Sequence, residues 1–324
     1  MNSTATPTPG PSRASSPTLD DDKLLRVPLY RFLAPRYWMI WISLGFVFGV
    51  SHLPYRATMW IGRVVGRIAY FFSRRDKQIA EVNIKMCLPH LSKIERRALM
   101  RKHFESLGCT LFETAYVWWA RDAWLRKFIR IEGTEHLATA LSKGRGALLL
   151  SAHFTTLELG AKALALVGPT SLMYLTPQNP LIAEMSRRGR ARKAVQAIAA
   201  DQIRELLQNL KNNVPVWYAP DQRYTDKNSA VVPLFGHPAW SNIATSRLAR
   251  ISKATVLPYF PERLDDGSGY VMRILPPFEN YPSNDPIVDT ERFHKLIEEH
   301  VQRCPAQYLW TYKRFKSPDV DPYK

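Results

Sequence analysis

The feature that most constrains this chain is a short apolar run, Ala147–Leu150, which is followed by small residues and then by His153. An uninterrupted apolar run of this length is typical of a strand buried on both faces of a parallel sheet. Thr155 or Thr156 can cap a helix that begins near Leu157. The stretch therefore predicts a strand, a turn and a helix, with His153 at the carboxyl end of the strand, where open α/β sheets bind ligands.

Glu158 follows His153 by five positions. Positions five apart do not share a face of one continuous helix, but they can meet across a strand-to-helix turn. We therefore expect the Glu158 carboxylate to hold one ring nitrogen of His153, leaving the other free as a general base. The same spacing recurs after His90 and His294, so spacing alone leaves open an ordinary loop histidine.

Apolar strand patterns alternate with helix patterns beyond residue 130, and no linker divides that part of the chain. The alternation predicts an α/β fold with a mixed, mainly parallel sheet flanked by helices. Expected strands cover residues 129–131, 147–150, 171–175, 214–219, 255–260, 270–275 and 308–312. Expected helices cover residues 78–87, 92–119, 123–128, 135–142, 159–166, 180–192, 201–210, 241–251 and 289–303.

Three regions are expected along the chain: a tail (1–22), a membrane anchor with an interfacial helix (23–75), and an α/β domain (76–324). The tail is rich in Ser, Thr and Pro and lacks the early apolar stretch of a signal peptide, so we expect it to be disordered. Residues 37–55 carry no charge and begin with clustered aromatics, which is typical of a membrane-anchoring helix.

The length of that anchor is borderline between a spanning and an interfacial helix, and a buried core helix is the alternative. The next segment places Arg63 and Arg67 on one helical face, with Trp60 and Val64 on another. This pattern predicts a basic amphipathic helix that lies on an anionic membrane.

The net charge of +17 and the pI of about 9.9 indicate an anionic partner. Nucleic acid, an acidic lipid surface and an acidic carrier protein all fit such a charge. The three cysteines form no Cys-x-x-Cys pair and have no histidine cluster nearby. We therefore expect neither a disulfide framework nor a zinc site, and a reducing compartment.

Three further stretches carry candidate binding residues. Arg190 belongs to a run of basic residues that can hold phosphates or form a solvated helix face. Asp221 ends a second buried strand beside the expected position of His153, although Pro-Asp is also an ordinary turn. Arg314 and Lys316 follow an aromatic stretch and suit an anionic headgroup or a carrier phosphate, or else a solvated basic end.

Several ordered motifs carry a family resemblance. They are His153-Phe154-x-Thr156-Leu157-Glu158, Pro177-x-Asn179-Pro180, Gly189-Arg190, Trp217-Tyr218-Ala219-Pro220-Asp221, Asn228-Ser229-x-x-Val232-Pro233-Leu234-Phe235, Thr245-x-Arg247-Leu248-Ala249-Arg250, and Gln307-Tyr308-Leu309-Trp310 with Arg314-Phe315-Lys316. Through them the chain resembles the lipid A secondary (late) acyltransferases of Gram-negative bacteria, the lauroyl/myristoyl transferases, from about residue 24 onward.

The resemblance implies a glycerolipid-acyltransferase-like fold, with His153 as catalytic base and Glu158 as its partner. It also implies that Arg190 and Asp221 are important for activity. One departure stands out, because the family often has an acid two residues after the matched Asp221, and this chain has Arg223.

The implied function is transfer of a lauroyl-like chain from acyl-acyl carrier protein to a secondary hydroxyl of a 3-hydroxyacyl chain on Kdo-lipid IVA. The implied place is the inner membrane, with the active site facing the cytoplasm and no nucleic-acid partner. No metal or organic cofactor is required, because a thioester already activates the acyl group. Two alternatives stay open: a glycerolipid or glycolipid acyltransferase of the same fold, and a basic membrane-bound lipid-binding protein without enzymatic activity.

Overall fold

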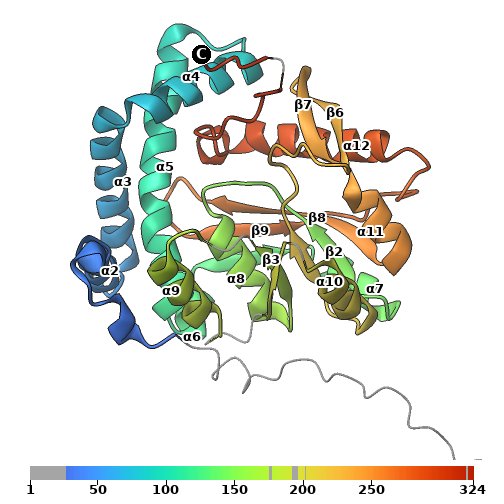
Figure 1. Cartoon of the computed structure of the whole chain (residues 1–324), viewed down its shortest axis with the longest axis horizontal. Coiled ribbons are helices and arrows are strands. Elements are labelled where there is room, and N and C mark those ends of the chain that lie inside the picture. Colours follow the sequence, from blue (N-terminus) through green and yellow to red (C-terminus); the bar gives the residue numbers. More distant parts are fainter. Residues whose placement is uncertain (1–26, 175–176, 192–195, 201, 319) are drawn as a thin grey trace, which may run out of the picture.

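The computed structural model describes residues 27–174, 177–191, 196–200, 202–318 and 320–324. The expected tail (1–22) and the last part of the basic run, Arg192 and Lys193, lie outside the described residues. Figure 1 shows a sheet with helices on both sides and a layer of long helices, α3 and α5, at one end.

The described residues form a seven-stranded central sheet. Its order is β1 (Ile129–Glu132), β9 (Tyr270–Ile274), β8 (Thr255–Arg263), β2 (Ala147–Leu150), β5 (Val216–Tyr218), β3 (Ser171–Tyr174) and β4 (Gln196–Ala199). The strands from β8 to β4 are parallel, whereas β9 runs antiparallel to β8 and carries β1 beside it. The predicted mixed, mainly parallel sheet is confirmed.

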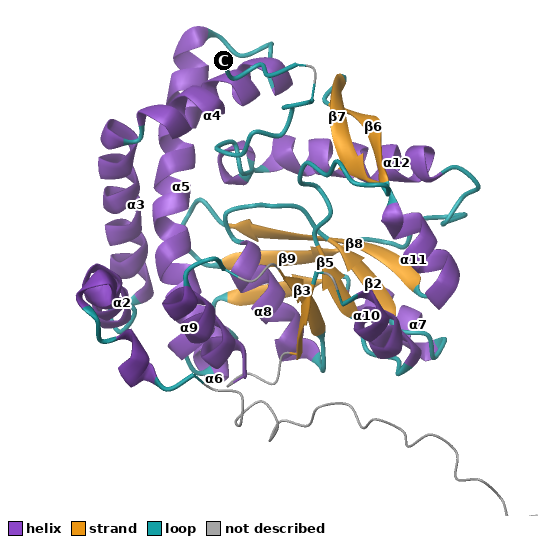
Figure 2. Cartoon of the chain, viewed as in Figure 1, coloured by secondary structure: helices purple, strands orange, loops and turns teal. Residues whose placement is uncertain are grey.

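Helices bury both faces of the sheet, which explains why β2 is an uninterrupted apolar run. Leu148 and Leu150 belong to one core and Ala147 and Leu149 to the other, and all four are almost completely buried. The first core includes residues from α10 (Ile203–Lys211), α11 (Ala244–Ser252) and α12 (Pro286–Arg303). The second includes α7 (Thr134–Ser142) and α8 (Leu157–Val167), and α5 (Lys93–Trp119) contributes to both (Figure 2).

The expected strand at 308–312 is wrong. Tyr308 makes a single bridge with Phe154, a short 3-10 helix (η3, Pro305–Gln307) precedes it, and turns follow. The segment bonds to the turn after β2 instead of joining the sheet, because Leu309 N–H donates to the His153 carbonyl at 3.0 Å. The antiparallel hairpin of β6 (Ser229–Leu234) and β7 (His237–Asn242) was not expected; Phe235 and Gly236 turn it with positive φ.

The N-terminal helices pack along α5. The helix α3 (Tyr55–Phe72) approaches α5 closely through glycine, because a Cβ on Gly66 would lie 2.1 Å from the Phe104 carbonyl oxygen. The helix α2 (Trp38–Val50) has 13 residues and spans about 20 Å at 1.5 Å per residue, against a hydrocarbon core of about 30 Å. Within the described ranges we find no helix with the length and apolarity needed to cross a membrane.

The remaining helical elements pack mainly against other helices. They are η1 (Leu29–Phe32), η2 (Pro35–Tyr37), α4 (Arg74–Cys87), α6 (Asp122–Leu125) and α9 (Pro180–Ala191). A capping box begins α5, since the side chains of Ser92 and Glu95 each accept the other's backbone N–H.

Candidate active site

His153 and Asp221 meet because they extend from neighbouring parallel strands by the same number of residues. Leu150 pairs with Tyr218 in the β2–β5 register, and each functional residue lies three positions beyond its strand's paired residue. The His153 ring Nδ1 lies 2.5 Å from Asp221 Oδ1. The second carboxylate oxygen, Oδ2, accepts the His153 backbone N–H at 2.9 Å. One carboxylate therefore fixes both the backbone and the ring of the histidine.

Each member of this pair stabilises the charged form of the other. Burial lowers the pKa of His153, but the Asp221 charge and hydrogen bond outweigh it and raise that pKa above its ordinary value. Burial raises the pKa of Asp221, but the His153 charge and hydrogen bonds outweigh it and lower that pKa. Asp221, 3% exposed, thus stays ionised and requires the proton on His153 Nδ1. The other ring nitrogen, Nε2, is left as an acceptor.

A cavity of about 860 Å³ lies beside the His153 ring. It opens where β3 and β5 diverge, because these strands pair only through Ser171–Val216 and Leu172–Trp217. Its apolar lining includes Leu157, Ala161, Leu172, Trp217 and Leu207. A cavity of this size and character can hold a fatty acyl chain.

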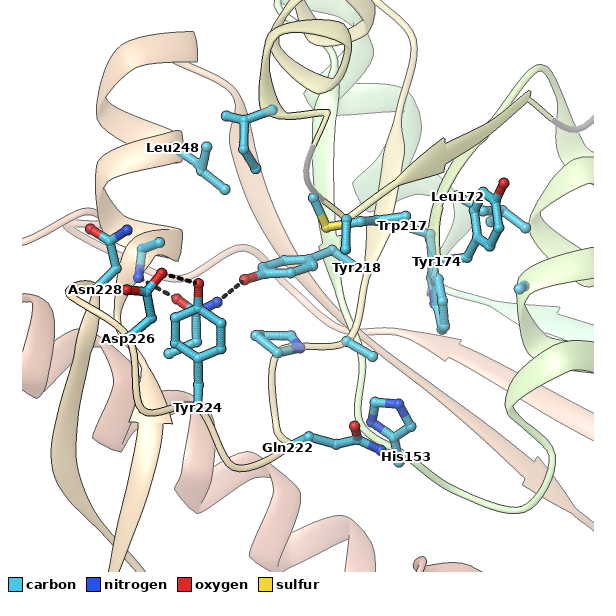
Figure 3. A pocket seen from close by; sticks show the side chains of 18 of the residues that line it. His153, Leu172, Tyr174, Trp217, Tyr218, Gln222, Tyr224, Asp226, Asn228 and Leu248 are labelled. Atoms are coloured by element: carbon cyan, nitrogen blue, oxygen red, sulfur yellow. Dashed lines mark hydrogen bonds between the residues drawn. The ribbon is translucent and has the colours of Figure 1, made fainter. Parts of the chain in front are cut away.

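The opposite wall of the cavity is polar (Figure 3). Tyr224 Oη donates to Asp226 at 3.2 Å, and Asn242 Nδ2 donates to Tyr218 Oη at 3.0 Å. Figure 3 places Gln222 next to His153, between this wall and the imidazole ring. The cavity therefore has an apolar part and a polar part.

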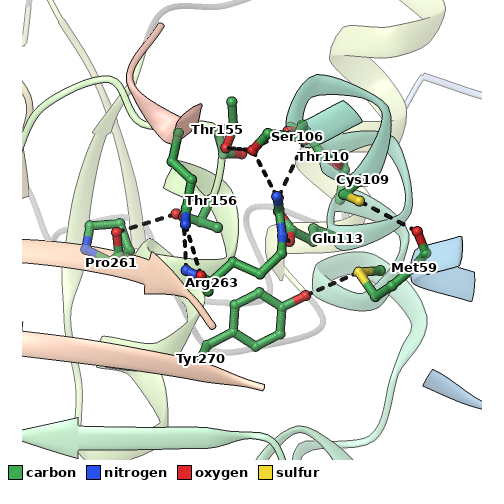
Figure 4. A network of polar contacts seen from close by, with 12 residues as sticks. Met59, Ser106, Cys109, Thr110, Glu113, Thr155, Thr156, Pro261, Arg263 and Tyr270 are labelled. Atoms are coloured by element: carbon green, nitrogen blue, oxygen red, sulfur yellow. Dashed lines mark hydrogen bonds and ion pairs between the residues drawn. The ribbon is translucent and has the colours of Figure 1, made fainter. Parts of the chain in front are cut away.

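A buried polar network holds the turn after His153 from behind (Figure 4). Thr155 Oγ1 lies 2.6 Å from Ser106 Oγ, and its carbonyl accepts from Thr110 Oγ1 at 2.9 Å. Its backbone N–H donates to the Gln307 carbonyl at 2.7 Å. Hydrogen bonds therefore hold the backbone just after His153 as well as its ring.

A buried ion pair anchors this network. Arg263 on β8 donates through Nε to Glu113 on α5 at 2.5 Å and through Nη1 to Ser106 Oγ at 2.7 Å. Gln307 exchanges two 2.8 Å hydrogen bonds with the Arg263 backbone. Nothing in the sequence indicated this network, because its charged members are 150 positions apart and follow no motif.

The predicted site residues fall in different places. Asp221, not Glu158, bonds to His153 Nδ1, because the strand register brings position 221 level with the histidine. Glu158 lies in the first turn of α8 and lines the same cavity. Arg190 lies in α9, close to the end of that helix, and its side chain is outside the described part of the structure.

The two C-terminal cations do not line the cavity. Arg314 is 3% exposed and donates to the Trp240 carbonyl and to Ser241 Oγ, so its two Nη groups hold β7. Lys316 is 45% exposed and pairs with Asp321 at 3.4 Å. Arg223 and Arg247, by contrast, do line the cavity.

Comparison with known proteins gives the family. The family model for bacterial lipid A biosynthesis acyltransferases matches residues 29–317. The chain is 35% identical over 286 residues to the lipid A biosynthesis lauroyltransferase of Escherichia coli (strain K12), covering 88% of this chain and 94% of that protein. It is 36% identical over 293 residues to the palmitoleoyltransferase of the same organism, covering 89% and 94%. Similarity to the E. coli myristoyltransferase is lower, 23% over 300 residues, covering 90% and 92%.

The family match spans the strand-borne histidine, its aspartate and the cavity beside them. The chain therefore belongs to the bacterial lipid A biosynthesis acyltransferase family and is an acyltransferase.

Proposed function

We propose that this enzyme transfers a lauroyl-like acyl chain from acyl-acyl carrier protein to the secondary hydroxyl of a 3-hydroxyacyl chain on Kdo-lipid IVA. The observation that carries the proposal is the His153–Asp221 pair beside a large, partly apolar cavity. The net charge of +17 suits both an acidic carrier protein and a phosphorylated lipid.

In the proposed reaction, His153 Nε2 takes the proton of the acceptor hydroxyl. The resulting alkoxide attacks the thioester carbonyl, and the tetrahedral intermediate collapses to an ester and a thiolate. The thiolate then takes the proton from the imidazolium. Asp221 fixes the tautomer and stabilises the imidazolium, and base catalysis of this kind contributes about 10²- to 10⁴-fold to the rate.

Glu158 is the second carboxylate that we assign to the reaction. It lines the cavity from the first turn of α8, directly after the turn that carries His153. With Nδ1 committed to Asp221, its proposed role is on the Nε2 side, near the acceptor hydroxyl and the developing imidazolium charge. Arg190, which the family resemblance implies to be important for activity, is proposed to bind the anionic part of a substrate.

We also propose that the enzyme binds the cytoplasmic face of the inner membrane through α2 and α3. Their outer surface exposes large apolar side chains, and arginines flank it. The exposed apolar residues are Trp38, Met39, Ile42, Phe46, Phe48, Trp60, Ile68, Phe71 and Phe72. Such a surface partitions into an anionic interface, so Phe71→Ser with Phe72→Ser is expected to weaken co-sedimentation with anionic vesicles.

The substrate assignment is tested with purified protein in detergent and carrier protein charged with C10 to C16 chains. A Kdo-bearing tetraacylated lipid A precursor and a lysophospholipid are offered separately, and products are identified by mass spectrometry. One added chain on the lipid A precursor, absent with His153→Ala, is the expected result. Transfer only to the lysophospholipid would show that the acceptor is a glycerolipid and not a lipid A precursor.

A further inference from the structure

Two arginines, Arg223 and Arg247, line the cavity without a partner for their side chains among the described residues. No hydrogen bond or ion pair joins the guanidinium of Arg223 or of Arg247 to another described residue, although both line the cavity. Arg223 is half-buried and Arg247 is exposed. A cation that borders a binding cavity and is not neutralised by the protein is available to an anionic ligand.

The two arginines belong to segments that are bonded to each other. Tyr224, next to Arg223, donates its backbone N–H to the Trp240 carbonyl at 3.4 Å, and Ile243 donates to the Asn228 carbonyl at 3.0 Å. Arg247 follows Ile243 by about one turn of α11. Both cations therefore border the polar wall that Figure 3 shows around Tyr224, Asp226 and Asn228.

The acidic groups of the cavity do not neutralise this pair. Asp226 is exposed and accepts from Tyr224 Oη at 3.2 Å and from the Lys227 backbone at 2.6 Å. Glu158, the other lining carboxylate outside the His153–Asp221 pair, has an interaction of its own within the protein. Asp221 itself is already committed to His153.

We propose that Arg223 and Arg247 form an anion-binding site that holds a phosphate group of the bound substrate at the polar end of the cavity. The proposal rests on the proposed acyl transfer. Guanidinium groups suit it, since each presents two parallel N–H donors that match phosphate oxygens. It also assigns a role to Arg223, the position where the chain departs from the pattern of the family it resembles.

Two substrates can supply the phosphate: the acceptor through its sugar phosphates, and the donor through its phosphopantetheine arm. The test measures KM and kcat for Arg223→Gln and Arg247→Gln in the full-length protein. One arm compares the phosphorylated acceptor with the same acceptor after phosphatase treatment. The other compares acyl-phosphopantetheine with acyl-pantetheine as donor. The matched control is Arg250→Gln. Arg250 lies on the same helix but does not line the cavity, and its guanidinium donates to the Ser283 carbonyl.

We expect each substitution to raise KM for one phosphorylated substrate roughly five- to fifty-fold, with kcat nearly unchanged, because charge-assisted hydrogen bonds are lost in the bound state. Wild type and variants should have similar KM values for that substrate without its phosphate. Arg250→Gln should change neither. A KM that rises less than two-fold in both variants, or that rises equally with the phosphate-free substrates, would overturn the site.

Direct binding separates this proposal from the proposed reaction. Dihexanoyl phosphatidic acid serves as a soluble phosphate-monoester probe in calorimetric titration against the wild type and both variants. Weaker binding by the variants supports the anion site even if no acceptor is acylated. Equal binding by all three proteins contradicts it, whatever the turnover assay shows.

Discussion

At the scale of single residues, the central feature is one carboxylate that serves a histidine twice. Asp221 binds both the ring and the backbone of His153, so removing its charge alters tautomer, ring orientation and basicity together. The sequence placed His153 and Asp221 at neighbouring strand ends, but it assigned the ring to Glu158. Sequence spacing identifies candidates, whereas the β2–β5 register decides which carboxylate reaches Nδ1.

Asp221→Asn is expected to lower kcat about 10²- to 10⁴-fold, because the amide no longer enforces the Nδ1 proton or stabilises the imidazolium. Steady-state acyl transfer, followed by mass spectrometry, measures the loss. Asp226→Asn is the control, since this carboxylate lines the same cavity without bonding to His153. Equal losses of kcat in the two variants would contradict a specific role for Asp221.

At the scale of elements, residues of α5 and β8 hold the turn that carries His153. Ser106 joins the Arg263–Glu113 ion pair to Thr155, two residues after the histidine. No local pattern indicates such a network, because its members are brought together only by the tertiary fold. The hairpin β6–β7 was unexpected for a different reason: its turn residues, Phe235 and Gly236, are not a common turn pair.

Ser106→Ala is expected to lower kcat roughly three- to thirty-fold while KM changes little, because Thr155 loses its side-chain partner and the turn loosens. Thr114→Ala is the control, as its hydroxyl donates only within α5, to the Thr110 carbonyl. Kinetics and melting temperatures are measured together. A fall in melting temperature without a change in kcat would show that the network only stabilises the fold.

We expect α8 to set the preference for the length of the acyl chain. Ala161 lines the apolar part of the cavity, so Ala161→Leu is expected to shorten the preferred donor. The ratio of kcat/KM for C14 over C10 should fall about ten-fold or more. Ala165→Leu, one turn further along α8 and away from the cavity lining, should leave that ratio unchanged. Competition between the two donors in one reaction measures the ratio directly.

At the scale of the whole molecule, three buried histidines make stability depend on pH. Burial is the main cause that lowers the pKa of His103, His294 and His300 to about 4 each. The unfolded chain binds these protons near pH 6.5, so the free energy of unfolding falls as the pH drops from about 6.5 to about 4. Each histidine contributes at most about 3 kcal/mol to this fall. His153, whose pKa is raised, acts in the opposite direction.

The melting temperature should therefore decrease steeply between pH 6.5 and pH 4. His103→Gln should flatten that dependence, because the amide can still donate to the Ala306 carbonyl without titrating. Differential scanning calorimetry at several pH values makes the comparison. Parallel curves for wild type and variant would show that His103 is not buried in its neutral form.

The fold class followed from the sequence because buried parallel strands and amphipathic helices leave strong local patterns. The order of the strands did not, since it depends on which helices cross which face of the sheet. Arg314 shows the same limit: a cation after an aromatic stretch suggested a solvated ligand site, but the fold buries its guanidinium against β7.

The most direct test of the central claim is the pH dependence of kcat/KM for acyl transfer by wild type and by Asp221→Asn. The carboxylate raises the pKa of His153 above its ordinary value. The fall of wild-type kcat/KM on the acid side, here called the acid limb, should therefore have its midpoint above pH 6.5. Without the Asp221 charge the limb should move to lower pH, with a lower plateau, and His153→Ala should show no limb of this kind. An acid limb unchanged by Asp221→Asn would contradict His153, held by Asp221, as the general base.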